Sequence, residues 1–194
     1  MSETLFFRFS GQEIEWVVRG QDGRRLEEGL SGVDLFNSRF PATYAGLTVF
    51  VVPGEKVLMT TASVPSNQKR KIAQAIPFVV EEQLAAEIEE CFFAIGERNK
   101  KGQIQVSIIY EQVLESLLAD LEGLDLRPEK MISETSLVKP GDSMVALIEE
   151  HKAHLMRLDG CGITLQKDNV GTAISIIDPS SSLELIGSGS SLES

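Results

Sequence analysis

The chain has 194 residues, of which 42% are hydrophobic, and it carries a formal net charge of -11 at pH 7. This composition predicts one or two globular domains whose core needs neither metals nor disulfides, and the negative charge argues against nucleic-acid binding over the whole surface. The N-terminus lacks a signal-peptide pattern, and no stretch approaches the ~18 apolar residues that cross a bilayer. We therefore predict a soluble, cytoplasmic chain that does not itself span a membrane.

The first fifty residues predict a meander of three strands, a short helix and a buried strand. Asp22-Gly23 is a good hairpin turn pair, and a helix is expected over Val33–Phe40. The continuous apolar run Leu47–Val52 is typical of a strand covered on both faces. The meander strands are expected at Leu5–Phe9, Ile14–Arg19 and Arg24–Leu30. This order is compatible with one half of an RNase H-like or actin-like protein, although it fits other α/β folds as well.

The next segment predicts the order strand, helix, strand, strand. The strands are expected at Val57–Val64, Cys91–Glu97 and Ile104–Tyr110. Between the first two, residues 65–90 are predicted to be helical because apolar residues recur every four positions, at Ile72, Ile76, Val80, Leu84 and Ile88. Pro77 lacks the N–H that a continuous helix needs, so it is expected to start a second helix or to kink a single one.

Charge is unevenly distributed along this predicted helix. Lys69, Arg70 and Lys71 lie in its first turns, whereas Glu87 and Glu89 lie near its end, and both placements oppose the helix dipole. Two interpretations stay open at this point. The charges form an ordinary solvated face, or they form a face that binds a partner.

The remaining residues predict a helix over Glu111–Leu121, a strand or loop over Pro128–Val138, and then a second meander. Its strands are expected at Ser143–Ile148, Ala153–Leu158 and Cys161–Gln166. The chain from Asp178 onward is rich in serine and glycine and is expected to be a flexible tail or linker. Because no comparable helix and strand are recognised after the meander, this second half is interpreted as truncated.

No pattern in the sequence predicts catalysis, a cofactor or a metal. His151 and His154 lie in strand or turn sequence without further ligands, so both are interpreted as ordinary surface histidines. Cys91 and Cys161 are interpreted as small core residues and not as a disulfide. Phosphate-binding glycine loops are absent, and the first hairpin, residues 8–12 (RFSGQ), has no carboxylate that could hold a metal beside a nucleotide.

Roughly residues 3–170 resemble a known family, the cytoplasmic region of protein L of the type II secretion system (the GspL family). The resemblance is most specific in Val64-Pro65, in residues 75–84 (AIPFVVEEQL) and in residues 89–93 (EECFF). Members of that family carry a similar Pro-aromatic-aliphatic-aliphatic-Glu segment, followed by an acidic turn and a His-Phe strand start. Phe92 stands here where the histidine is usual.

The resemblance implies an α/β (α+β) fold with two actin-like, RNase H-like halves and an inserted module. The first domain would comprise residues 1–53 and 124–140, and the inserted strand-helix-strand-strand module would comprise residues 54–123. Residues 141–178 would begin a second RNase H-like domain, and residues 179–194 would be a flexible tail or linker.

The resemblance also implies a function. This chain would be a non-catalytic adaptor on the cytoplasmic face of the inner membrane that recruits the secretion ATPase through that enzyme's N-terminal domain. The full-length protein would be a homodimer and would reach platform proteins M, F and C, with a membrane helix that this chain lacks. Expected partner-binding residues are Lys69, Arg70, Lys71, Pro77, Glu81, Glu82, Glu87 and Glu89. The alternatives are a PilM-like pilus adaptor that binds a peptide, and an actin-like ATPase or kinase.

Overall fold

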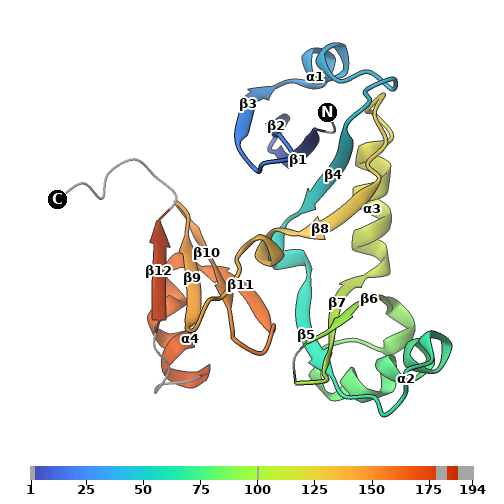
Figure 1. Ribbon diagram of the computed structural model, residues 1–194, viewed down its shortest axis with the longest axis vertical. Helices are drawn as coiled ribbons and strands as arrows, with labels where there is room; N and C mark the ends of the chain where they lie inside the picture. The colour runs from blue at the N-terminus through green and yellow to red at the C-terminus, as the bar shows by residue number, and fades with distance from the viewer. Residues whose placement is uncertain (1–2, 100, 178–182, 188–194) are drawn as a thin grey trace. The chain divides into compact units, whose positions relative to one another are not determined.

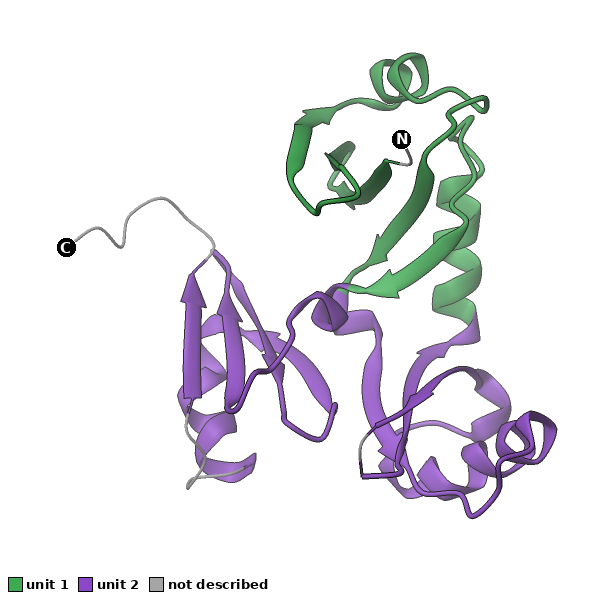
Figure 2. Ribbon diagram, in the orientation of Figure 1, with its two compact units in different colours: residues 1–53, 112–133 green, residues 54–111, 134–194 purple. Residues whose placement is uncertain are grey.

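The computed structural model describes residues 3–99, 101–177 and 183–187 (Figure 1). The chain forms two compact units (Figure 2). Unit 1 comprises Met1–Pro53 and Gln112–Ser133, and unit 2 comprises Gly54–Glu111 and Glu134–Ser194. Most of the helix after the inserted strands therefore belongs to unit 1. Among the described helices, none is long and apolar enough to cross a membrane.

Unit 1 contains one five-stranded sheet in the order β3-β2-β1-β4-β8. Neighbours β1, β2 and β3 are antiparallel, whereas β4 is parallel to both β1 and β8. The predicted meander, helix and buried strand are confirmed, and Gly23 has a φ of 76° in the hairpin turn. The elements of the unit are β1 (Thr4–Ser10), β2 (Glu13–Arg19), β3 (Arg25–Ser31), α1 (Val33–Arg39), β4 (Leu47–Val52), α3 (Glu111–Leu121) and β8 (Lys130–Ser133).

Aromatic side chains form the core of unit 1. Phe7 of β1 alternates with more exposed neighbours along the strand, so it points into the core. Its ring lies 5.2 Å from that of Phe36 in α1 and 5.5 Å from that of Phe50 in β4. These contacts hold α1 against the sheet, and Phe40 continues the cluster at 5.1 Å from Phe36.

Unit 2 contains a seven-stranded sheet in the order β12-β9-β10-β11-β5-β7-β6. A shared apolar cluster, which includes Met59, Val145 and Met156, connects the inserted module with the second meander. The helices and strands of the unit are β5 (Leu58–Ala62), α2 (Lys69–Val80), β6 (Cys91–Arg98), β7 (Ile104–Tyr110), β9 (Met144–Ile148), β10 (Lys152–Met156), β11 (Gly162–Gln166), α4 (Val170–Ile177) and β12 (Leu183–Gly187). Short 3-10 turns are η1 (Gly54–Lys56), η2 (Glu81–Gln83), η3 (Ile88–Glu90), η4 (Glu134–Leu137) and η5 (Lys167–Asn169).

The second meander is followed by a helix and a strand, which corrects the expectation that this half lacks them. Helix α4 packs through Val170, Ile174 and Ile177 on β9 and β10, and β12 pairs parallel with β9. The order β-β-β-α-β therefore repeats the start of unit 1, where β4 is parallel to β1. Residues 183–187 were hidden within the expected tail because only five residues pair there, amid a serine-rich composition. Residues 179–182 and 188–194 lie outside the described residues.

The predicted long helix is shorter than its apolar period indicated. Helix α2 ends at Val80, and Leu84 adopts an extended conformation after η2, with φ -92° and ψ 147°. Pro77 lies inside this single helix and does not begin a second one. Ile76 and Val80 are fully buried against the sheet, whereas Leu84 reaches the same core from the following loop. The four-residue spacing of apolar residues continues beyond the helix because α2 and the loop after it pack on the same apolar surface.

Candidate functional site

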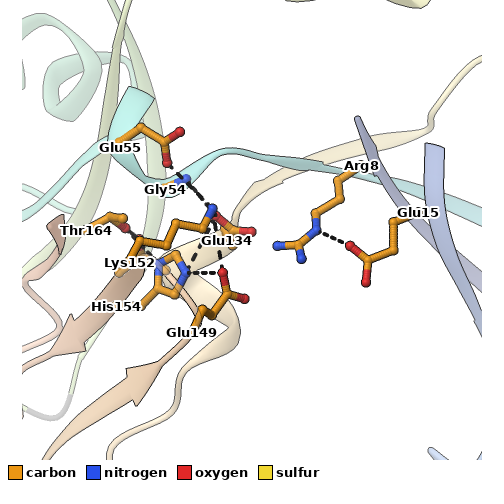
Figure 3. Close-up of polar contacts among 10 residues, drawn as sticks. Arg8, Glu15, Gly54, Glu55, Glu134, Glu149, Lys152, His154 and Thr164 are labelled. Carbon is orange, nitrogen blue, oxygen red and sulfur yellow. Dashed lines mark hydrogen bonds and ion pairs between the residues drawn. The ribbon is translucent and has the colours of Figure 1, made fainter. Parts of the chain in front are cut away.

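A cluster of charged and polar side chains lies within unit 2, beside η1 (Figure 3). The Glu134 carboxylate is at its centre and is only 5% exposed. Its Oε2 atom lies 2.5 Å from Lys152 Nζ and accepts a hydrogen bond of 3.2 Å from the Gly54 backbone N–H. The same ammonium lies 3.8 Å from a carboxylate oxygen of Glu55 and 3.8 Å from one of Glu149. Three carboxylates therefore surround one cation.

His154 extends this cluster into the core, and its interpretation as a surface histidine is wrong. The side chain is fully buried, and Nδ1 lies 2.8 Å from Thr164 Oγ1, which in turn lies 2.7 Å from Thr135 Oγ1. Within the described residues, Nε2 has no hydrogen-bond partner, although it lies 3.6 Å from Glu134 Oε2 and 3.7 Å from Glu149 Oε2. The sequence feature that indicates burial of His154 is its position between the apolar residues Ala153 and Leu155 of β10.

The cluster contains the donor atoms of a metal site but is already occupied by a cation. Glu134, Glu149 and His154 each offer one ligand atom, and these atoms lie within 4.8 Å of one another. Two carboxylates and an imidazole suit a transition metal. Because the Lys152 ammonium lies at hydrogen-bonding distance from Glu134, a metal ion would have to displace it. The arrangement is that of an internal ion network.

Gly54 allows the backbone to approach this network closely. A Cβ atom on Gly54 would lie 2.1 Å from Thr164 Oγ1 and 2.6 Å from Thr135 Oγ1. Both distances are far below van der Waals contact, and neither short side chain can move away while it keeps its hydrogen bonds. A side chain at this position would therefore separate η1 from η4 and β11.

We expect Gly54→Ala to lower the free energy of unfolding by about 1–3 kcal/mol, the usual cost of overpacking a filled interior. Urea denaturation followed by circular dichroism measures this change. Gly141→Ala is the matched control, because a Cβ atom there meets no atom within 4 Å and its φ is not left-handed. Equal urea midpoints for the two variants would contradict the packing described here.

The expected partner-binding residues lie along one continuous stretch of unit 2 but not on one helix. Lys69, Arg70 and Lys71 are exposed in the first turn of α2, and Pro77 is half-buried within it. The acidic members follow in the loop between α2 and β6. Glu81 and Glu82 belong to η2, Glu87 precedes η3 and Glu89 lies within it, and all four are exposed. The basic and acidic groups are thus on different local structures.

A cleft of about 290 Å³ borders this loop. Gln83, Leu84 and Cys91 line one part of it, and residues of η1 and β11 line another. Gln83 is held there because its Oε1 accepts a hydrogen bond of 2.6 Å from Thr60. Burial, together with nearby Glu90 and Glu111, raises the pKa of the Cys91 thiol. The thiol therefore stays protonated at neutral pH and is a poor nucleophile.

The first hairpin of unit 1 contains an ion pair. Arg8 in β1 is opposite Glu15 in β2, and the Nε to Oε2 distance is 2.7 Å (Figure 3). Gly11 forms the turn with a φ of 64°. No carboxylate occurs between the two strands at residues 11 and 12.

The repeated β-β-β-α-β units define the class to which this chain belongs, that of actin-like folds. A solved protein from Bacteroides thetaiotaomicron, described as having an actin-like ATPase fold and unknown function, matches with a TM-score of 0.55 and 11% identity. The alignment covers 99% of this chain and 84% of that one. The cytoplasmic domain of EpsL from Vibrio cholerae matches with a TM-score of 0.72 and 17% identity, over 96% of this chain and 83% of that domain.

Sequence comparisons identify the family within that class. The family model described as type II secretion system (T2SS), protein L, matches residues 6–186, and the chain belongs to this family. Protein L of Dickeya chrysanthemi is 29% identical over 171 residues, which are 86% of this chain and 43% of that protein. Protein L of Pectobacterium carotovorum is 27% identical over 129 residues, which are 65% of this chain and 30% of that protein. The chain thus spans less than half the length of these relatives.

Proposed function

We propose that this chain is a non-catalytic adaptor of the type II secretion system that recruits the secretion ATPase, through the N-terminal domain of that enzyme, to the inner-membrane platform. Membership of the protein L family supports the assignment to this system. The similar Vibrio cholerae protein is described as an inner-membrane component of that system. The chain would act on the cytoplasmic face of the membrane, and the full-length protein would dimerise and contact platform proteins M, F and C.

Residues 8–12, around the turn of the first hairpin, contain no carboxylate, and this supports a non-catalytic role. Phosphoryl transfer needs groups that neutralise the phosphate charge, most often a metal ion held by carboxylates. Residues 8–12 offer an arginine, a serine and a glutamine instead. The carboxylates of the second half, Glu134 and Glu149, lie next to the Lys152 ammonium.

The exposed acidic loop between α2 and β6 is the main support for the proposed contact with the ATPase. Glu81, Glu82, Glu87 and Glu89 are all exposed, and residues 81–97 contain no lysine or arginine that could compensate their charge locally. Rim charges of this kind speed association with an oppositely charged partner more than they add to affinity. The binding face on the ATPase domain would therefore be basic.

Charge reversal of this loop tests the proposal. We expect Glu81→Lys with Glu82→Lys, and separately Glu87→Lys with Glu89→Lys, to slow association with the ATPase N-terminal domain about tenfold at low salt. The loss should shrink at moderate salt, since the Debye length falls to about 8 Å at 0.15 M. Surface plasmon resonance at two ionic strengths measures both effects.

Glu115→Lys with Glu122→Lys is the matched control, because both residues are exposed and belong to or follow α3 in unit 1. All variants should keep their urea midpoints, since exposed substitutions change stability by about 0.5 kcal/mol or less. Unchanged association for both loop pairs, with the fold intact, would reject this face. The interface would then be sought at Lys69, Arg70 and Lys71.

A further inference from the structure

Strand β6 is the last strand of the seven-stranded sheet and pairs only with β7 among the described strands. The pairing is regular from Cys91, opposite Tyr110, to Ile95, opposite Val106. In an antiparallel pair, the backbone N–H and C=O groups of every second residue point away from the partner strand. The outer edge of Cys91–Ile95 therefore presents a row of main-chain donors and acceptors.

One donor of this edge is already used. The Cys91 N–H donates to the Ile88 carbonyl and closes η3 at the start of the strand. Across the described part of the chain, the other backbone hydrogen bonds outside regular helices and ladders do not involve Phe92, Phe93, Ala94 or Ile95. The free part of the edge therefore begins after the Cys91 N–H.

The regular part of this edge ends between Ile95 and Arg98. The pairing with β7 shifts between Ile95 and Arg98, which is a β-bulge and ends the regular edge. The Arg98 guanidinium donates hydrogen bonds of 2.6 Å to the Gly102 carbonyl and 2.9 Å to the Val64 carbonyl, and another to that of Ser66. Arg98 is exposed, but its guanidinium is held by these main-chain carbonyls of the same unit, and the bulge limits the regular edge to Cys91–Ile95.

The surroundings of the edge are both acidic and apolar. Residues 81–97 contain six glutamates and no lysine or arginine. Glu87, Glu89 and Glu90 come directly before the strand and are exposed. Within the strand, Phe92 is 47% exposed and Ile95 is 39% exposed. Many open edges carry lysine, proline or a covering segment that blocks further pairing. Residues Cys91–Ile95 contain neither lysine nor proline, and among the described strands only β7 pairs with them.

These charges decide what can add to the edge. A second copy of this chain would bring its own glutamates against those of the first, and like charges at an interface oppose association. An extended segment that alternates basic and apolar residues would meet the glutamates with its cations and Phe92 with its apolar side chains. Its main chain would satisfy the open donors and acceptors.

We propose that the outer edge of β6 binds an extended segment of a partner protein, rich in lysine or arginine, by β-strand addition. This inference rests on the proposed function and names its mode of recognition. The acidic loop attracts the partner, and the edge of Cys91–Ile95 sets its register. The exposed Phe92 selects an apolar residue between two basic ones.

The test uses the ¹⁵N-labelled chain and amide hydrogen exchange measured by NMR. The probe is a peptide of about seven residues that alternates lysine and valine, and a glutamate-valine peptide of the same length is the control. At about ten times the dissociation constant, the basic peptide should slow exchange roughly tenfold at alternate amides of residues 92–95. The acidic peptide should leave these amides unchanged. Equal effects of the two peptides, protection confined to other residues, or no protection at all overturns the inference.

Two proline variants test the main-chain contact itself. The backbone N–H groups of neighbouring strand residues point to opposite edges. Of the two substitutions Ala94→Pro and Ile95→Pro, one therefore removes an N–H that points outward, which an edge strand tolerates. The other removes a hydrogen bond to β7. The variant that keeps its urea midpoint should lose the peptide protection. Retained protection in that variant overturns the inference.

The ATPase N-terminal domain serves as a second probe and separates this inference from the proposed function. Binding of that domain without protection of the β6 amides would keep the proposed function and overturn strand addition. Protection by the basic peptide together with no binding of the domain would keep strand addition and reject the ATPase as the partner.

Discussion

Glu134→Ala is expected to lower the free energy of unfolding by about 3 kcal/mol, which is the low end for breaking a buried ion pair. The substitution leaves Lys152 without its closest carboxylate, which lies 2.5 Å away, and removes the acceptor for the Gly54 N–H. We expect the low end because the Lys152 side chain keeps 29% exposure and still has Glu149 nearby. For a chain of this size, such a loss lowers the melting temperature by about 6–12 °C.

Glu55→Ala is the control for this prediction. The Glu55 carboxylate faces the same ammonium, but at 3.8 Å and with 50% of its side chain exposed. Exposed ion pairs are worth about 0–1 kcal/mol, so the melting temperature should fall by only a few degrees. If both variants melt alike in calorimetry, the buried pair does not stabilise unit 2 in the way described.

Ile76→Ala is expected to lower the free energy of unfolding by about 2–5 kcal/mol, the range for truncating a buried isoleucine. Ile76 is fully buried on α2, in the cluster that includes Val80, Val106 and Ile108. The truncation leaves a cavity under the helix, because β5 and β7 are held by their ladders and cannot close it. Urea denaturation followed by circular dichroism measures the loss.

Phe78→Ala is the matched control on the same helix. Its side chain is 67% exposed, so its removal should change stability by about 0.5 kcal/mol or less. The comparison also tests which face of α2 packs into the core. A loss for Phe78→Ala as large as that for Ile76→Ala would mean that α2 is rotated relative to the structure described here.

Unit 2 contains two groups of glutamates that differ in how their charge is compensated, one in the ion network and one beside the β6 edge. In the network, glutamates surround a lysine of the same chain, so their charge is compensated internally. In residues 81–97, the glutamates have no basic residue within the segment. A basic partner is thus expected at residues 81–97 and not at the ion network.

Local patterns in the sequence determined most of the fold. The alternating strands of both meanders, the Asp22-Gly23 turn and the buried strand Leu47–Val52 are confirmed as β1–β4 and β9–β11. Each of these depends on side-chain periodicity or on turn residues within about ten positions, which the sequence displays directly. The resemblance of roughly residues 3–170 to protein L is confirmed by the family match over residues 6–186.

Tertiary structure alone decided where α2 ends and what His154 contacts. The period Ile72, Ile76 and Val80 continues to Leu84 because helix and loop pack on the same core, and periodicity cannot distinguish these two ways of burying a side chain. The ion network joins Gly54 of η1 to Glu134 of η4 and His154 of β10, which are far from it in sequence. Such contacts depend on sheet order and register, which no local pattern encodes, and the same sheet order leaves β6 at the edge.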